Sequence, residues 1–167
     1  KWDAQGIPFK KTTKQLLEKM KLAGCYKLQF GLESGSDKVL KKMGKIFTVK
    51  EAEEVIRNSH EAGILTELFI IVGHPGEEES DFEKTMEFIK RNKEYIDGVK
   101  SINALHLISG TELYDNHEAW GIILPERDWH YLWRTRDNKN TPEIRNKRIK
   151  QLMELLKELN IPLTESN

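Results

Sequence analysis

The order of strand and helix patterns constrains the fold of this chain more than any other feature. Three segments with strand patterns, 26–33, 68–73 and 99–108, follow one another at about 35-residue spacing, with helical patterns between them. Such alternation is typical of right-handed βαβ units and predicts a parallel sheet of the α/β class. It fits a sheet with helices on both faces or part of a β/α barrel. In either, sites lie at the C-terminal ends of the strands.

The helical segments carry recognisable N-terminal signals. Thr48 and Glu51 have the spacing of a capping box, and Ser80 and Glu83 have the same spacing further along the chain. A shorter helical pattern, with an acidic residue early and lysines late, spans 34–44. These signals predict that short turns lead from the strands into the helices that follow them.

The last third of the chain has a different composition. Residues 117–136 hold three of the four tryptophans, Trp120, Trp129 and Trp133, which predict a core cluster or an interface. Thr141 and Pro142 then begin a final helix. Its predicted apolar face consists of Ile149, Leu152, Met153, Leu156 and Leu159. We therefore expect a β/α part over 1–116 and an aromatic-rich segment with a C-terminal helix over 117–167.

Charge and cysteine content exclude several classes of function. The 167 residues include 27 basic and 27 acidic side chains, so no basic face for nucleic acid or for a membrane surface is evident. No apolar run reaches the roughly 18 residues of a membrane span. A single cysteine cannot supply the three or four thiolates that iron–sulfur clusters usually take, and the histidines show no metal-binding spacing. We expect a cytoplasmic domain without a metal site of its own.

The strand over 26–33 has two distinct faces. Tyr26, Leu28, Phe30 and Leu32 share one, and Lys27, Gln29, Gly31 and Glu33 share the other. If the apolar face meets the helices, Glu33 points to the opposite side, which in a barrel is the interior. Burying a carboxylate there is costly unless it accepts hydrogen bonds. Glu33 would therefore accept hydrogen bonds from a ligand hydroxyl or amine; the alternative is that it caps the next loop or pairs with a lysine.

The apolar strand over 68–73 ends in a turn that also has features of a ligand site. Gly73 has no side chain, so a ligand can approach the backbone closely, and Pro75 and Gly76 are typical of a turn. Ile71 shares the strand parity of Gly73, so a flat apolar ligand such as an adenine ring could lie on it. The alternative for Ile71 is ordinary core packing.

Three segments together resemble the radical S-adenosylmethionine (radical SAM) superfamily. They are GCYKLQFGLESGSDKVLKKMGK, FIIVGHPGEEESDFEKTMEFIK and SGTELY, and the resemblance covers residues 12–115. It is strongest to the group that often carries an N-terminal cobalamin-binding domain. The resemblance implies the C-terminal half of a partial β/α barrel, in which S-adenosylmethionine is the cosubstrate. The complete enzyme would form a 5′-deoxyadenosyl radical or, with cobalamin, transfer a methyl group.

The resemblance also implies roles for individual residues. Glu33 corresponds to a position that contacts the ribose or the methionine end of S-adenosylmethionine, and Ile71 belongs to an element that packs on adenine. The full set of cofactor-binding candidates is Gln29, Gly31, Glu33, Ser34, Ile71, Gly73, Pro75 and Asn103. Two positions depart from the family pattern: Phe69 replaces a glycine, and Ser109 replaces the proline of a PGT turn. Catalytic residues and the substrate are not indicated.

The [4Fe-4S] cluster that the resemblance implies has no ligands here. The family holds it on a C-x-x-x-C-x-x-C loop, which this sequence lacks, and Cys25 lies roughly 26 Å before Glu33 along the strand, at 3.3 Å per residue. We therefore expect the upstream half of the same polypeptide to hold the cluster, with residues 2–8 forming a loop after its last strand. The isolated piece would self-associate through exposed sheet edges.

Two other interpretations remain open from the sequence. One is a non-catalytic binding or assembly module with the same half-barrel shape. The other is a phosphate-binding fragment of a β/α-barrel enzyme, which would use a strand-end glycine turn for the anion. The phosphate-binding interpretation predicts no effect of Glu33→Ala on S-adenosylmethionine binding. The binding module is distinguished by the upstream sequence, where a C-x-x-x-C-x-x-C loop would favour the enzyme.

Overall fold

A parallel four-stranded sheet forms the centre of the molecule. The computed structural model describes residues 1–126 and 130–164. The strands lie in the order β1-β2-β3-β4, with β1 at Trp2–Gly6, β2 at Cys25–Glu33, β3 at Leu65–Val72 and β4 at Gly98–Ala104. All three neighbouring pairs are parallel, so the predicted α/β class is confirmed.

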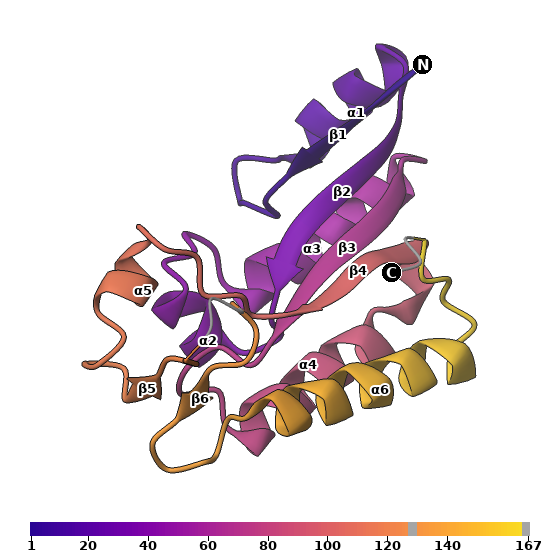
Figure 1. Cartoon of the computed structure of the whole chain (residues 1–167). Coiled ribbons are helices and arrows are strands. Elements are labelled where there is room, and N and C mark those ends of the chain that lie inside the picture. The colour runs from indigo at the N-terminus through magenta and orange to yellow at the C-terminus, as the bar shows by residue number, and fades with distance from the viewer. Residues whose placement is uncertain (127–129, 165–167) are drawn as a thin grey trace.

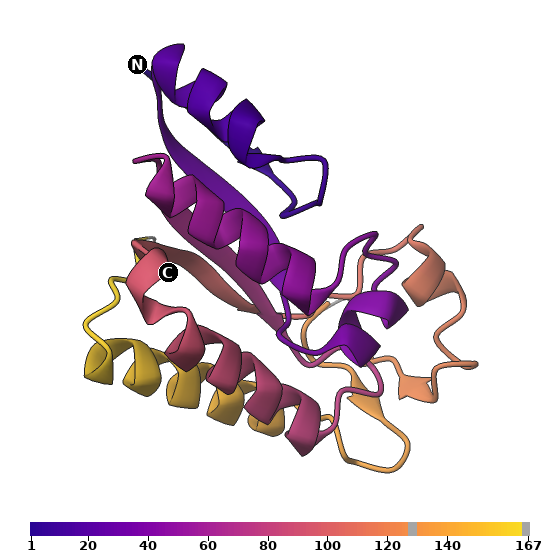
Figure 2. The same ribbon diagram turned by 180° about the vertical axis from the view of Figure 1, so that it is seen from behind.

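Helices cover one face of this sheet and leave the other open (Figures 1 and 2). The helices are α1 (Lys14–Leu22), α2 (Asp37–Lys42), α3 (Val49–Glu61), α4 (Glu79–Arg91), α5 (Glu112–Asp115) and α6 (Pro142–Glu158), with a 3-10 turn at Lys93–Tyr95. A short antiparallel pair joins β5 (Ile122–Ile123) to β6 (Arg134–Thr135). Helix α6 lies beside α4, and α2, α5, β5 and β6 gather at the C-terminal ends of the strands (Figure 1).

The first segment was predicted as a loop, and this was wrong. Residues 2–6 form β1, which pairs with β2 from Trp2 opposite Cys25 to Gly6 opposite Phe30. Trp2, Asp3, Ala4 and Gln5 alternate between apolar and polar, but the segment has only five residues and ends in glycine, so its strand signal is weak. Pairing with the edge of β2 supplies the hydrogen bonds that make it a strand. At the other end, β4 stops at Ala104 rather than 108, because the chain then turns into a second apolar cluster.

One of the two predicted capping boxes is correct. Thr48 accepts a hydrogen bond from the Glu51 amide at 3.2 Å, and the Glu51 carboxylate accepts one from the Thr48 amide at 2.9 Å. The box at Ser80 and Glu83 was wrong. Helix α4 begins at Glu79, because the buried Asp81 carboxylate accepts a hydrogen bond from the Glu78 amide at 3.1 Å. The predicted pair and the observed pair, Glu78 with Asp81, have the same three-residue spacing. The burial of Asp81 determines which of the two begins the helix.

The main core lies between the sheet and the helices. The predicted two faces of β2 are confirmed for most of its length: Leu28, Phe30 and Leu32 belong to this core, whereas Tyr26, near the start of the strand, is exposed. Helix α6 contributes Leu152, Leu155 and Leu156. Met153, predicted on the same face, is 47% exposed, and two arginines are buried instead, Arg145 and Arg148.

A second, smaller cluster packs beyond the strand ends. Its buried members are Leu107, Ile122 and Trp133, with Trp120 packed against them. Trp129 lies outside the described residues. The cluster draws on residues on both sides of the boundary predicted between 116 and 117. Within the described part of the chain, no helix has the length and apolar character needed to cross a membrane.

Candidate functional site

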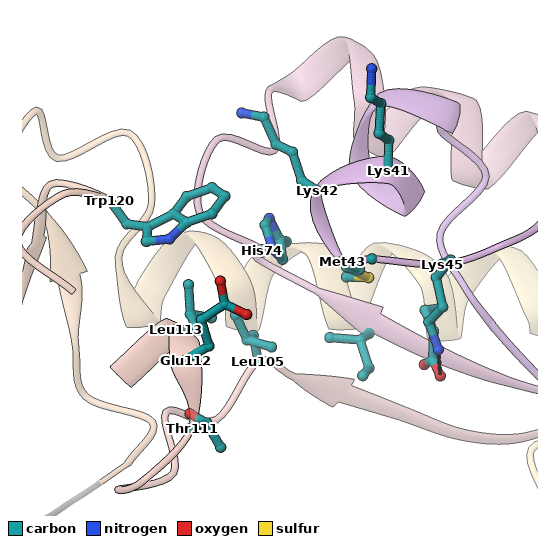
Figure 3. Close-up of a pocket in the computed structure, with 13 residues that line it drawn as sticks. Lys41, Lys42, Met43, Lys45, His74, Leu105, Thr111, Glu112, Leu113 and Trp120 are labelled. Atoms are coloured by element: carbon teal, nitrogen blue, oxygen red, sulfur yellow. Dashed lines mark hydrogen bonds and ion pairs between the residues drawn. The ribbon is translucent and has the colours of Figure 1, made fainter. Parts of the chain in front are cut away.

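Two hollows adjoin at the C-terminal end of the sheet. The larger, of about 550 Å³, lies between the strand ends and helices α2 and α5 (Figure 3). The smaller, of about 360 Å³, lies on the open face of the sheet. Glu33 and Ile71 line both. The site predicted from the two strand ends is therefore one continuous region, with these two residues at its centre.

The backbone at the end of β2 directs Glu33 toward the open face. Glu33 has a φ of 66°, uncommon for a residue with a side chain, and a bulge interrupts the β2–β3 pairing between Gly31 and Glu33. A Cβ placed on Gly31 would lie 2.8 Å from Glu33 Oε1, so the carboxylate extends over this glycine. Lys45 Nζ donates to the same oxygen at 2.9 Å. The lysine partner considered from the sequence is thus present, and the carboxylate still borders both hollows.

The end of β3 divides into an open and a closed part. Ile71 is half-buried and lines the hollows. Gly73 has a φ of 83°, but a Cβ there would overlap Cγ and Cδ of Arg145 from α6. The space beside Gly73 is therefore filled by an arginine side chain and not left for a ligand, which differs from the prediction. Pro75 is buried in the turn and borders neither of the two hollows.

Ser34 faces the helical layer. Its hydroxyl lies 3.3 Å from Thr85 Oγ1 in α4, and the Ser36 amide donates to Ser34 Oγ at 3.2 Å. The side chain is fully buried and borders neither hollow. The structure therefore gives Ser34 a role in holding the β2 turn against α4, and does not bring it together with Glu33 and Ile71.

Gln29 and Asn103 both lie on the open face. Gln29 Nε2 donates to Glu67 Oε2 at 2.7 Å, and Gln5 Nε2 donates to Gln29 Oε1 at 3.1 Å, so Gln29 joins β1, β2 and β3 below the hollows. Asn103 lines the smaller hollow beside Gly31. Of the eight predicted residues, the structure brings four to the hollows: Gly31, Glu33, Ile71 and Asn103.

Other lining residues had weak signals or none in the sequence. His74 is buried, its Nδ1 lies 2.8 Å from the Pro75 carbonyl, and burial lowers its pKa, which favours a neutral ring at neutral pH. The Trp120 ring meets His74 edge-on at 5.4 Å, and the Lys42 amine lies 5.9 Å from the Trp120 ring (Figure 3). Trp120 belonged to the predicted tryptophan cluster, but its place beside His74 depends on how the chain crosses the strand ends.

The described residues do not fit an iron–sulfur cluster. Cys25, the only cysteine in the sequence, is buried at the start of β2, the end of the strand opposite Glu33, and burial raises its pKa. No group of three or more His, Cys, Asp or Glu side chains in residues 1–126 and 130–164 could hold a metal ion. The prediction that Cys25 is a small buried core residue is confirmed.

Similarity to known proteins identifies the family. Residues 6–89, half of the chain, match the Radical SAM superfamily. The chain belongs to the radical SAM superfamily. A probable threonylcarbamoyladenosine tRNA methylthiotransferase from Pyrococcus horikoshii is 39% identical over 82 residues, 46% of this chain and 19% of the relative. A tRNA-2-methylthio-N(6)-dimethylallyladenosine synthase from Thermosipho melanesiensis is 34% identical over 140 residues, 81% of this chain and 27% of the relative.

Solved radical SAM structures share the fold. Coproporphyrinogen III oxidase (HemN) from Escherichia coli superposes with a TM-score of 0.63 at 15% identity, covering 94% of this chain and 32% of that one. The methyltransferase TsrM from Kitasatospora setae, solved with cobalamin and a [4Fe-4S] cluster, superposes with a TM-score of 0.59 at 18% identity, covering 87% and 29%. This radical SAM chain thus spans less than a third of the length of the proteins it matches here.

Proposed function

We propose that this chain is the S-adenosylmethionine-binding half of a radical SAM enzyme. The observation that carries the proposal is the position of Glu33 and Ile71 on the border of both hollows. The Glu33 carboxylate would accept hydrogen bonds from ribose hydroxyls or from the ammonium group of the methionine end. Ile71 would contact the adenine ring, with Asn103 and Gly31 lining the adjoining open face.

The larger hollow fits S-adenosylmethionine in size and in chemistry. Its volume of about 550 Å³ is in the range of pockets that hold ligands of this size. S-adenosylmethionine carries a sulfonium and an ammonium cation, a carboxylate and a flat purine. The hollow offers carboxylates from Glu33 and Glu112, amines from Lys41 and Lys42, and apolar contact from Leu105 among others.

The reductive step belongs to the complete protein. The upstream half of the polypeptide would hold the [4Fe-4S] cluster, which would supply the electron that converts S-adenosylmethionine to a 5′-deoxyadenosyl radical. The residues of this chain would bind the adenosyl part, fix its orientation and limit the access of water. The chain would not be competent alone. The proposal places the complete enzyme in the cytoplasm, with cobalamin as a second cofactor in the case that the enzyme transfers a methyl group.

The same proposal assigns a partner to the edge strand. Most residues of β1 are exposed, and its free edge lies at the end of the strand order. The upstream half would pair with this edge and complete more of the barrel. In the isolated piece, the edge would pair with a second copy of the chain.

The decisive experiment is Glu33→Ala in the complete polypeptide, with S-adenosylmethionine affinity measured by titration calorimetry under anaerobic conditions. A charge-assisted hydrogen bond contributes about 1.5–3 kcal/mol, so we expect the dissociation constant to rise at least tenfold. The control is Glu87→Ala, which removes an exposed carboxylate paired with Lys90. Unchanged affinity in the Glu33 variant would overturn the assignment.

The same titration separates the two rival functions. A phosphate-binding fragment would bind inorganic phosphate and not S-adenosylmethionine, whatever residue stands at 33. A non-catalytic module would bind neither. The same samples are measured for iron content and for the electron paramagnetic resonance signal of the reduced cluster. These two measurements show whether the upstream half contains its [4Fe-4S] cluster.

A further inference from the structure

Three side chains from α6 and the loop before it hold the turn that follows β3. This turn (residues 73–77) connects the Ile71 end of β3 to α4. The three side chains are Asn140, Arg145 and Arg148, and together we name them the α6 anchor. All three are at most 3% exposed. They lie more than 60 residues along the chain from the turn, so no local sequence pattern links the two.

Asn140 binds the carbonyl groups of the turn. Its Nδ2 donates to the Gly73 carbonyl at 2.9 Å and to the His74 carbonyl at 3.3 Å. Its Oδ1 accepts a hydrogen bond from Arg145 Nη1 at 2.8 Å. The amide group is therefore held in one orientation while it fixes two consecutive carbonyls. One of these belongs to His74, whose ring lines the larger hollow.

Arg145 fills the space beside Gly73. Its aliphatic carbons occupy the position where a Cβ at 73 would lie. Its Nη2 donates to the Trp133 carbonyl at 2.7 Å, and the guanidinium stacks 4.0 Å from the Trp133 ring centre. Burial lowers the Arg145 pKa to about 10, so the group stays charged at neutral pH. Arg145 thus ties the turn to the smaller core cluster that contains Trp133.

Arg148 acts on the turn through Glu77. Arg148 Nη1 donates to Glu77 Oε2 at 2.7 Å, and the same oxygen accepts the Gly73 amide at 2.6 Å. Both side chains are almost completely buried, at 3% and 1% exposure. A buried ion pair of this kind holds one geometry, because movement of either partner leaves a charge without compensation. The Gly73 amide is therefore fixed by a chain of two side chains that ends on α6.

We infer that the α6 anchor positions the S-adenosylmethionine pocket: Asn140, Arg145 and Arg148 are positioning residues that hold the β3 turn, and with it His74 and Ile71, in the binding geometry. The inference rests on the proposed function. None of the three residues borders the larger hollow, so they act through the turn and not by touching the ligand. By thermodynamic linkage, ligand binding also strengthens the docking of α6.

The test compares three variants of the complete polypeptide. Asn140→Ala removes the hydrogen bonds to both carbonyls. The double variant Glu77→Gln with Arg148→Gln removes both buried charges together and so avoids leaving one unpaired. Leu17→Ala is the control, because Leu17 is fully buried in α1, away from the turn. Each sample is measured for S-adenosylmethionine affinity, iron content and hydrogen–deuterium exchange at residues 73–77.

We expect the dissociation constant for S-adenosylmethionine to rise about tenfold in the first two variants, as for displaced binding groups, with iron content unchanged. Exchange at residues 73–77 should become faster in these variants even without ligand. The Leu17 control loses stability but should keep its affinity. Wild-type affinity in both anchor variants, or an equal loss in the control, would overturn the inference. If the wild-type protein does not bind S-adenosylmethionine, the proposed function fails. Faster exchange at residues 73–77 in the two anchor variants would then still show that the α6 anchor holds the turn.

Discussion

β2 and β3 are neighbours in the sheet, and both end in a polar turn that contains glycine. The end of β2 faces the open side of the sheet: Glu33 borders two hollows, and Gly31 leaves room for its carboxylate. The end of β3 is open only as far as Ile71, and from Gly73 onward it is enclosed by α6. Similar sequence signals thus border open hollows in one case and attach a distant helix in the other.

The two turns are also held by different helices. The β2 turn is attached to α4, since Ser36 Oγ donates to Asp81 Oδ1 at 2.8 Å and Ser34 lies against Thr85. The β3 turn is attached to α6 through Glu77 and Arg148. A pocket that spans both turns therefore depends on two helices that contribute no lining residue to the larger hollow. Variants that perturb one attachment at a time measure how much each attachment contributes to the free energy of unfolding.

The largest expected effect is at Gly73. Gly73→Ala introduces a Cβ that overlaps Arg145, at a position with positive φ. We expect the free energy of unfolding to fall by about 3 kcal/mol, as overpacking adds to backbone strain. Gly110→Ala is the matched control, with a φ of 81° and no heavy atom within 4 Å of the position that the new methyl group would take; it should cost about 1 kcal/mol. The measurement is urea unfolding. If the two variants lose the same free energy of unfolding, the Arg145 side chain moves aside at no cost in free energy.

The second effect is the pH dependence of the β2 attachment. Burial alone raises the pKa of Asp81, but Lys38, the Glu78 amide and Ser36 outweigh it and hold the pKa at about 2, below the ordinary 3.8. Because the folded-state pKa is the lower one, the stabilisation is complete above pH 3.8 and is lost as the pH falls through 2. The shift corresponds to about 2 kcal/mol.

Asp81→Asn should therefore lower the free energy of unfolding by about 2 kcal/mol at pH 6, and the gap to wild type should close toward pH 2. The measurement is urea unfolding at a series of pH values. Asp115→Asn, at an exposed position, serves as the control. A gap that stays constant with pH would mean that Asp81 acts through hydrogen bonding alone and that its charge has no effect.

The smallest effect is at Gly31 in the complete protein. Gly31→Ala places a methyl group 2.8 Å from Glu33 Oε1, so the flexible carboxylate must move. We expect S-adenosylmethionine to bind about fivefold more weakly, equivalent to one weakened hydrogen bond, with little change in stability. Combined with Glu33→Ala, the Gly31 change should have no further effect. An additive loss in the double variant would mean that Gly31 contacts the ligand directly.

Local patterns in the sequence predicted much of the fold and part of the site. The alternation in β2 separated Leu28 and Phe30 from Glu33, because strand geometry places successive side chains on opposite faces. The Thr48–Glu51 capping box was correct because its two residues are only three positions apart, so the local sequence contains both partners. Strand β1 was missed, because its alternation extends over only a few residues and its pairing with the edge of β2 makes it a strand.

The sequence by itself determined the parallel α/β class, the division of β2 into a buried and an open face, and the membership in the radical SAM superfamily. The first depends on the order of strand and helix patterns, the second on alternation within one strand, and the third on three short segments taken together. The tertiary structure alone decided that Gly73 is covered by Arg145, that Ser34 faces α4, and that Trp120 lies against His74. Each of these contacts joins residues at least 46 positions apart, and the packing of α4, α6 and the tail around the strand ends brings them together.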